Sequence, residues 1–123
     1  MLYEKMKKFF NRRTGFLAED LAVAALKEKG YIILERNFAN RFGEIDIIAK
    51  DKNVLVFVEV KAKTGADFGL PEEMVGKKKL EKIRHMAVIY TKGKTLPSRL
   101  DVIAIVFNNN NQLLRLTHYE NVY

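Results

Sequence analysis

The apolar residues of the chain recur with two different spacings, one typical of helices and one typical of strands. Residues 14–29 have helical spacing, with Thr14 as a cap at the start and Gly30 as a stop after the end. The apolar positions of this helix are Leu17, Leu21, Ala22, Ala25 and Leu26. A second helix is predicted to open at Pro71, with two acidic residues in its first turn, and to end before Gly93.

Five further segments have strand character. They are Tyr31–Leu34, 44–50, 54–62, Leu100–Phe107 and Leu113–Leu116. The third is apolar at odd and even positions alike, which is typical of a central strand covered on both faces, and the fifth is predicted to be an edge strand. The order α-β-β-β-α-β-β predicts an α/β fold with a mixed central β-sheet flanked by helices. The second helix is the kind of crossover that parallel neighbours need.

Composition narrows the class of protein. A length of 123 residues with 48% hydrophobic residues suits a single domain with a substantial core. The absence of Cys excludes a disulfide scaffold and a thiolate zinc site. No run of about 18 uncharged apolar residues is present, so no membrane span is predicted. The first residues lack the apolar run of a signal peptide, and we therefore expect an intracellular, cytoplasmic protein.

The net charge of +7 comes from two segments. Residues 1–13 hold five bases and one acid, and residues 71–94 hold seven bases and three acids, so each contributes +4 and the rest of the chain sums to −1. Such basic segments suit a polyanionic partner such as nucleic acid, although they also serve solubility alone. The candidates for phosphate contact are Lys63, Lys77, Lys78, Lys79, Lys82 and Arg84.

The basic segment 1–13 is set apart from a domain over residues 14–123. It is compatible with a basic arm, with an amphipathic helix on a membrane surface and with a frayed terminus. The two histidines have no metal-ligand spacing and are expected to be structural.

The residues with the most chemistry lie in the predicted hairpin over residues 44–62. A two-residue loop at Lys52 and Asn53 would pair residues whose numbers sum to 105, which sets Asp46 opposite Glu59 with Cβ atoms about 4.5–5.5 Å apart. A three-residue loop or a bulge would shift this pairing. Two facing carboxylates raise a carboxyl pKa or recruit a cation, and Mg²⁺ prefers carboxylates, waters and phosphate oxygens.

Lys61 follows Glu59 on the same face of the predicted strand. A divalent cation, a lysine and a basic rim together suit phosphodiester hydrolysis. Alternate acids on a strand are also typical of a solvated face, and a Glu-x-Lys pair is typical of a weak surface salt bridge. The residues alone leave both interpretations open.

Asp46 followed by Glu59-Val60-Lys61 resembles the PD-(D/E)xK nuclease signature, with an upstream helical acid in Glu19 and a spacing similar to that of the archaeal Holliday-junction resolvases. More closely, the chain resembles the bacterial YraN-like family of restriction-endonuclease-like proteins, most of which are uncharacterised. The matching stretches are 15–22, GYIIL at 30–34, Asn37, GEIDIIA at 43–49, VFVEVK at 56–61, FGLPEE at 68–73 and RLDVIAI at 99–105, with His118 and Asn121 near the end. Ile45 departs from the usual Pro, and Leu80 stands where relatives often have Gln.

The resemblance implies a restriction-endonuclease-like core and a metal-dependent DNA endonuclease, with branched or structured DNA among its substrates. Asp46, Glu59 and the backbone carbonyl of Val60 would be ligands of Mg²⁺ or Mn²⁺, and Lys61 would be the catalytic lysine. Glu19 would approach directly or through a water, and Glu44 is a secondary candidate. Resolvase-like substrates suggest a two-fold homodimer. The alternatives are a nucleic-acid-binding module of the same fold with weak or no activity, and a structural or partner-binding domain.

Overall fold

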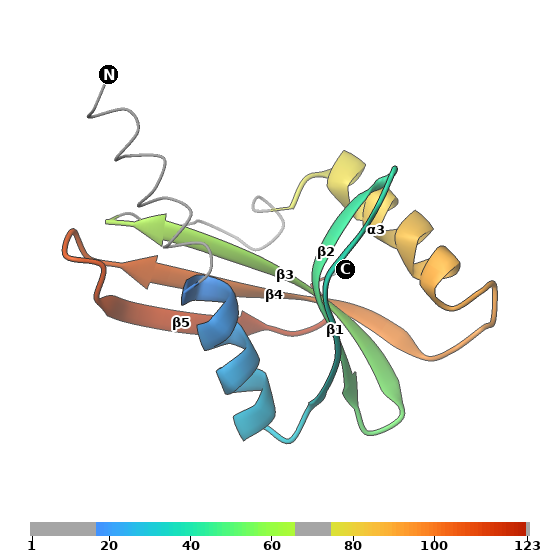
Figure 1. The fold of residues 1–123 in the computed structure, drawn as a ribbon, viewed down its shortest axis with the longest axis horizontal. Coiled ribbons are helices and arrows are strands. Elements are labelled where there is room, and N and C mark those ends of the chain that lie inside the picture. Colours follow the sequence, from blue (N-terminus) through green and yellow to red (C-terminus); the bar gives the residue numbers. More distant parts are fainter. Residues whose placement is uncertain (1–16, 66–74, 123) are drawn as a thin grey trace.

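The computed structural model describes residues 17–65 and 75–122, and their elements follow the predicted order (Figure 1). The described residues open with a helix over residues 17–28. It is followed by β1 (Ile32–Asn40), β2 (Gly43–Asp51), β3 (Val54–Thr64), α3 (Lys77–Tyr90), β4 (Ser98–Phe107) and β5 (Leu113–Tyr119). The predictions made for the segment 1–13, for Thr14 and for residues 68–73 lie outside the described residues.

The strands form one mixed sheet in the order β1-β2-β3-β4-β5. β3 and β4 are parallel and the other neighbours are antiparallel, so the predicted α/β domain with a mixed sheet is confirmed. The predicted central position of β3, the crossover through α3 and the edge position of β5 are confirmed as well.

Three predicted boundaries were wrong. β1 continues to Asn40 rather than ending at Leu34, because its backbone pairs with β2 as far as Asn40 and Gly43 although most of its side chains are exposed. β5 continues to Tyr119 rather than ending at Leu116. α3 begins at Lys77 rather than at Pro71, because Gly76 has an extended backbone with ψ 164°, which no residue inside a helix adopts.

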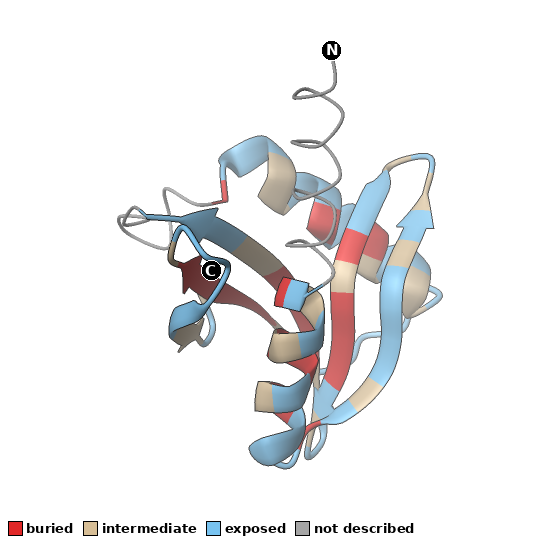
Figure 2. Ribbon diagram, turned by 60° about the vertical axis from the view of Figure 1, so that its left-hand side comes forward, coloured by how far each residue is buried: buried red, intermediate tan, exposed pale blue. Residues whose placement is uncertain are grey.

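The two helices cover opposite faces of the sheet, and each face has its own core (Figures 1 and 2). The helix over residues 17–28 packs Ala22 and Leu26 against one face. The sheet side of this core consists of Ile47, Ala49, Val56, Val58, Ile103, Ile105 and Phe107. α3 packs Ile83 and Met86 against the other face. The sheet side of that core consists of Ile45, Ile48, Phe57, Leu100 and Val102.

The hairpin of β2 and β3 has the predicted register only in part. Paired residues sum to 105 from Asp51–Val54 to Ile47–Val58, and the regular ladder ends there, one pair short of Asp46 and Glu59. Ile45 and Ile47 belong to the cores of opposite faces, although alternate residues of a regular strand share a face. The backbone of β2 therefore changes face beside Asp46, where β2 and β3 diverge (Figure 1).

Candidate metal centre

Three carboxylates meet where β2 and β3 diverge. Glu19 comes from the helix over residues 17–28, and Glu44 and Asp46 come from β2. One ligand oxygen from each lies within 4.8 Å of those of the other two. Glu19 and Asp46 are half-buried and Glu44 is exposed, so the group is open to solvent on one side. We call these three carboxylates, together with Glu59 and Lys61 described below, the acidic centre.

Asn37 ties two of these carboxylates together. In the amide orientation that satisfies its hydrogen bonds, Asn37 Nδ2 donates to Glu19 Oε1 at 2.7 Å and to Glu44 Oε1 at 2.8 Å. Asn37 lies on β1 with φ 53°, a left-handed conformation that Asn tolerates better than most residues. The irregular backbone at this position aims the amide at the acidic centre. Sequence reasoning matched Asn37 to the family but gave it no role, because a single polar residue on an exposed strand carries no periodic signal.

Glu59 lies beside this group and is nearly inaccessible, with 5% of its surface exposed. Its Oε1 lies 3.7 Å from Lys61 Nζ and 3.6 Å from Lys79 Nζ. Its Oε2 is buried and has no hydrogen-bond partner among the described residues. Burial and the negative charge of Asp46 raise the pKa of Glu59 to about 7, against the opposing effect of the two lysines.

Asp46 occupies the middle of the acidic centre. Its Oδ2 accepts a hydrogen bond of 2.8 Å from the Val60 backbone N–H, which holds the side chain against β3. Burial and the charge of Asp46 also raise the pKa of Glu19, while Asn37 and Arg36 lower it. Asp46 therefore acts electrostatically on Glu19 and on Glu59, and the predicted proximity of Asp46 and Glu59 holds although the ladder stops short of them.

The donor set of this cluster suits a hard divalent cation. Its groups are carboxylates, and Mg²⁺ and Mn²⁺ prefer such oxygen ligands. Protein interiors rarely leave a buried carboxylate oxygen without a partner. Among the described residues, ionised Glu59 has no partner for Oε2, and the adjacent Asp46 carboxyl can pair with it only by sharing a proton. Glu19, Glu44 and Asp46 bring their ligand oxygens together, and the buried Glu59 lies beside Asp46, so the observed chemistry fits such an ion.

The predicted phosphate-contacting residues do not all lie together. Lys79 Nζ lies 3.6 Å from Glu59 Oε1 and therefore beside the acidic centre, and its contact with phosphate stays a prediction. Lys77, Lys78, Lys82 and Arg84 are exposed along α3, and Lys63 is exposed near the end of β3. Their contact with nucleic acid stays a prediction, as does the ligand role of the Val60 carbonyl.

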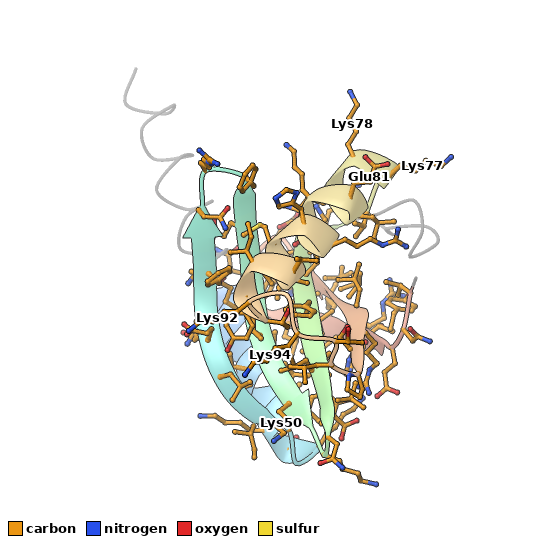
Figure 3. The ribbon with its side chains drawn as sticks, turned by 90° about the vertical axis from the view of Figure 1, so that its right-hand side faces the viewer. Lys50, Lys77, Lys78, Glu81, Lys92 and Lys94 are labelled. Atoms are coloured by element: carbon orange, nitrogen blue, oxygen red, sulfur yellow. The ribbon has the colours of Figure 1, made fainter. Side chains whose placement is uncertain are left out.

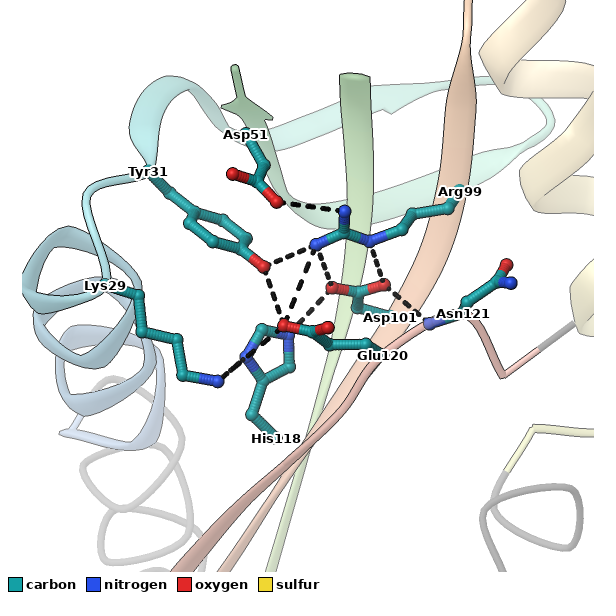
Figure 4. Close-up of polar contacts among 8 residues, drawn as sticks. All are labelled: Lys29, Tyr31, Asp51, Arg99, Asp101, His118, Glu120 and Asn121. Carbon is teal, nitrogen blue, oxygen red and sulfur yellow. Dashed lines mark hydrogen bonds and ion pairs between the residues drawn. The ribbon is translucent and has the colours of Figure 1, made fainter. Parts of the chain in front are cut away.

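A second polar cluster surrounds Asp101 on β4, whose side chain is fully buried (Figure 4). Arg99 Nε donates to Asp101 Oδ1 at 3.0 Å, and the Asn121 backbone N–H donates to the same oxygen at 2.9 Å. His118 Nε2 lies 2.7 Å from Asp101 Oδ2, and Lys29 Nζ lies 2.8 Å from His118 Nδ1. Because an ammonium only donates, Nδ1 is the acceptor and Nε2 carries the proton toward Asp101.

Arg99 links this Asp101 cluster to other elements. Its Nη1 donates to Asp51 Oδ2 at 3.1 Å, and its Nη2 donates to the Tyr31 hydroxyl. The Tyr31 hydroxyl donates to Glu120 Oε1 at 2.9 Å, and burial together with this bond raises the pKa of Tyr31 to about 12. Hydrogen bonds thereby link side chains from Lys29, near the helix over residues 17–28, to Asn121, near the end of the chain. The structural role predicted for His118 agrees with this arrangement.

A comparison with known proteins decides the family. The sequence model of the uncharacterised protein family UPF0102 matches residues 18–105. The chain belongs to the UPF0102 family. This agrees with the YraN-like resemblance seen in its motifs.

Relatives in the UPF0102 family match over most of the chain. A UPF0102 protein of Dictyoglomus turgidum is 40% identical over 116 residues, covering 92% of this chain and 98% of the relative. One of Persephonella marina is 50% identical over 100 residues, covering 77% and 84%. One of Syntrophus aciditrophicus is 48% identical over 98 residues, covering 77% of each chain. Within the part of the chain that the structure describes, no helix has the length and apolar character needed to cross a membrane.

Proposed function

We propose that this UPF0102 protein is a metal-dependent endonuclease that hydrolyses phosphodiester bonds of DNA. The observation that carries the proposal is the buried Glu59 carboxylate, which has an oxygen without a partner beside Asp46 and an ammonium 3.7 Å away on Lys61. A structural salt bridge on a solvated face would have neither the burial nor the free oxygen. The observation therefore favours a ligand-binding role over the surface interpretation.

The proposed core is restriction-endonuclease-like and of the PD-(D/E)xK type. Three features support it: an acid on the first helix, an Asp on β2, and Glu-x-Lys on the adjacent β3. Asp46, Glu59 and the Val60 carbonyl would hold Mg²⁺ or Mn²⁺, with Glu19 and Glu44 on the open side. When bound, the ion polarises the phosphate and lowers the pKa of an attacking water.

The side chains have separate tasks in this proposal. The Val60 N–H and the Asn37 amide hold the carboxylates in place through their hydrogen bonds of 2.7–2.8 Å. The Lys61 ammonium donates a hydrogen bond to a phosphate oxygen as negative charge develops there, or orients the attacking water. Lys79, on α3, partly neutralises the negative charge of Glu59 on β3.

The test is cleavage of labelled linear, single-stranded, flapped and four-way-junction DNA in Mg²⁺, Mn²⁺ or EDTA. Glu59→Ala should lose cleavage, whereas Glu28→Ala, which removes an exposed acid from the helix over residues 17–28, should keep it. Lys61→Met should abolish single-turnover cleavage at saturating protein, whereas Lys63→Met should at most weaken binding. Cleavage that persists in EDTA or in Glu59→Ala would contradict the proposal.

The same assay separates the alternative functions. Salt-sensitive binding without cleavage in any metal would identify a nucleic-acid-binding module. Neither binding nor cleavage would point to a structural or partner-binding domain. A two-fold homodimer, proposed from the analogy with resolvases, is tested by the mass of the protein in light scattering, with and without junction DNA.

A further inference from the structure

A groove of about 440 Å³ separates the turn between β1 and β2 from α3. Its lining combines cations with aromatic rings, and one acid lies among them. The lining residues are Arg41, Phe42, Lys78, Glu81, Lys82 and His85. The sequence analysis predicted phosphate contact for the two lysines and a structural role for His85, and it gave Phe42 no role.

The two rings form a stacked platform. The ring centroids of Phe42 and His85 lie 4.3 Å apart with planes inclined by 37°. The Arg41 guanidinium lies 4.8 Å from the Phe42 centroid. The Phe42 backbone N–H donates to Asn40 Oδ1 at 2.8 Å, which fixes the turn that carries the ring. Planar bases stack on such aromatic and guanidinium surfaces in single-stranded nucleic acids.

The two lysines of the groove lie in the first two turns of α3, where cations do not stabilise a helix. Lys78 and Lys82 lie one turn apart on the same side of α3, with Glu81 among the residues beside them. Like charges at this spacing, and cations in the first turn, are both unfavourable for a helix. The first turn of α3 contains no acid that would offset them. Two lysines beside stacked rings suit successive phosphates of one strand.

The groove adjoins the acidic centre. Phe42 is separated from Glu44 only by Gly43, and a Cβ on Gly43 would lie 3.5 Å from Met86 Sδ, so the turn rests directly on α3. On α3, Lys78 lines the groove while the next residue, Lys79, reaches Glu59. Figure 3 shows Lys77, Lys78 and Glu81 together at the start of α3, far from Lys92 and Lys94 beyond its other end.

From these observations we propose that the groove binds an unpaired nucleotide of a nucleic-acid strand that continues into the acidic centre. Its base stacks on the outer face of the His85 ring, which Phe42 supports from the other side, and its flanking phosphates contact Lys78 and Lys82. This inference rests on the proposed function and adds the substrate class, a strand with a single-stranded segment.

The first test uses the full chain in EDTA, so that it measures binding in the absence of cleavage. Fluorescence anisotropy compares a labelled thymidine oligonucleotide with an abasic oligonucleotide of the same length. His85→Ala should weaken binding of the thymidine strand by about tenfold and leave binding of the abasic strand unchanged. Phe42→Leu, which keeps the apolar contact with the core, should act in the same direction.

The second test distinguishes phosphate contacts in the groove from a general effect of the protein's positive charge. Lys78→Gln with Lys82→Gln should reduce the magnitude of the slope of log affinity against log salt by about 1.4, because each phosphate contact on a single strand contributes about 0.7. Lys92→Gln with Lys94→Gln removes the same charge near the far end of α3 and should leave the slope unchanged.

Several outcomes would overturn the inference. One is that the wild type binds no oligonucleotide. Another is that His85→Ala and the wild type bind the thymidine strand equally. A third is that the two lysine pairs change the salt slope equally. If the wild type cleaves DNA with metal and His85→Ala binds the thymidine strand as the wild type does, nucleotide binding in the groove is contradicted and the proposed endonuclease activity is kept. Binding that depends on His85, without cleavage in any metal, would support nucleotide binding in the groove and contradict the proposed endonuclease activity.

Discussion

Glu59 and Asp101 are the two buried acids of the described residues, and their surroundings are opposite. Asp101 accepts hydrogen bonds from Arg99, His118 and the Asn121 backbone. Burial alone would raise the pKa of Asp101, but these bonds outweigh it and hold that pKa below its ordinary value. Glu59 has one oxygen without a partner, and its pKa is raised to about 7 by burial and by Asp46.

The difference separates a carboxylate whose partners are all supplied by the fold from one that, in the proposed function, takes a cation as its partner. The Asp101 cluster joins the end of the first helix, the end of β2, and β4 and β5 into one network (Figure 4). The acidic centre gathers like charges where two strands part, which costs folding free energy. In the proposed function, a bound divalent cation would offset this cost.

The largest expected effect is on Asp101. Asp101→Asn should lower the free energy of unfolding by about 3 kcal/mol, because it leaves the half-buried Arg99 without its main partner and sets an amide against the His118 donor. Urea unfolding followed by circular dichroism measures the change. A loss below about 1 kcal/mol would show that the cluster contributes little to the fold.

Glu59→Gln removes the other buried charge and should raise the free energy of unfolding, whereas Asp101→Asn lowers it. The pKa of Glu59 rises from 4.5 to about 7 on folding, so the folded protein holds this proton more tightly and loses stability as the pH rises between these values. In the metal-free protein at pH 8, Glu59→Gln should therefore raise the free energy of unfolding by about 2 kcal/mol.

The pH dependence supplies the control for Glu59→Gln. At a pH near 4.5 the wild type keeps this carboxyl protonated, so the variant and the wild type should unfold at similar urea concentrations. A variant that is less stable than the wild type at pH 8 would mean that the ionised Glu59 is well satisfied, and the contrast with Asp101 would be lost.

Asn37→Gly sharpens the comparison within the acidic centre. Glycine keeps the left-handed backbone and removes only the amide that bridges Glu19 and Glu44. We expect Mn²⁺ affinity, measured by calorimetry, to fall by about tenfold. Asn111→Gly makes the same change at φ 59° in the turn between β4 and β5 and should leave Mn²⁺ affinity unaltered. Equal affinities in both variants and the wild type would exclude the bridging role.

The smallest expected effect is on an exposed ion pair. Asp20 Oδ1 lies 2.8 Å from Arg36 Nη2, with 64% and 38% of the two side chains exposed. Asp20→Asn should change the free energy of unfolding by less than about 1 kcal/mol, because solvent screens the pair. A loss as large as that of Asp101→Asn would show that burial is not what distinguishes the Asp101 cluster.

Local pattern predicted the parts of this fold that depend on neighbours in the sequence. The turn at Lys52 and Asn53 fixed the register of β2 and β3, and that register brought Asp46 toward Glu59. The divergence of the strands at Asp46 was not predictable, because the apolar pattern of β2 continues through it. α3 was placed too early because Pro71 and two acids make a plausible helix start that Gly76 then excludes.

Features that depend on distant residues were missed. The Asp101 cluster brings Tyr31, Arg99 and His118 together from three separate segments, and no spacing in the sequence signals it. The stacking of Phe42 on His85 likewise requires the turn between β1 and β2 to lie on α3. In the acidic centre, sequence reasoning named the carboxylates and Lys61 but not the Asn37 amide that joins two of them.

The central claim is that the acidic centre binds a divalent cation, and calorimetric titration of the full chain with Mn²⁺ at pH 7.5 tests it most directly. The wild type should bind Mn²⁺, Asp46→Asn should show no saturable heat, and Glu28→Gln, an exposed acid on the first helix, should match the wild type. Wild-type affinity should also fall at pH 5.5, because Glu59 and Glu19 must lose protons whose pKa values are raised. Binding that is equal in Asp46→Asn and the wild type, or absent from the wild type, would contradict the account.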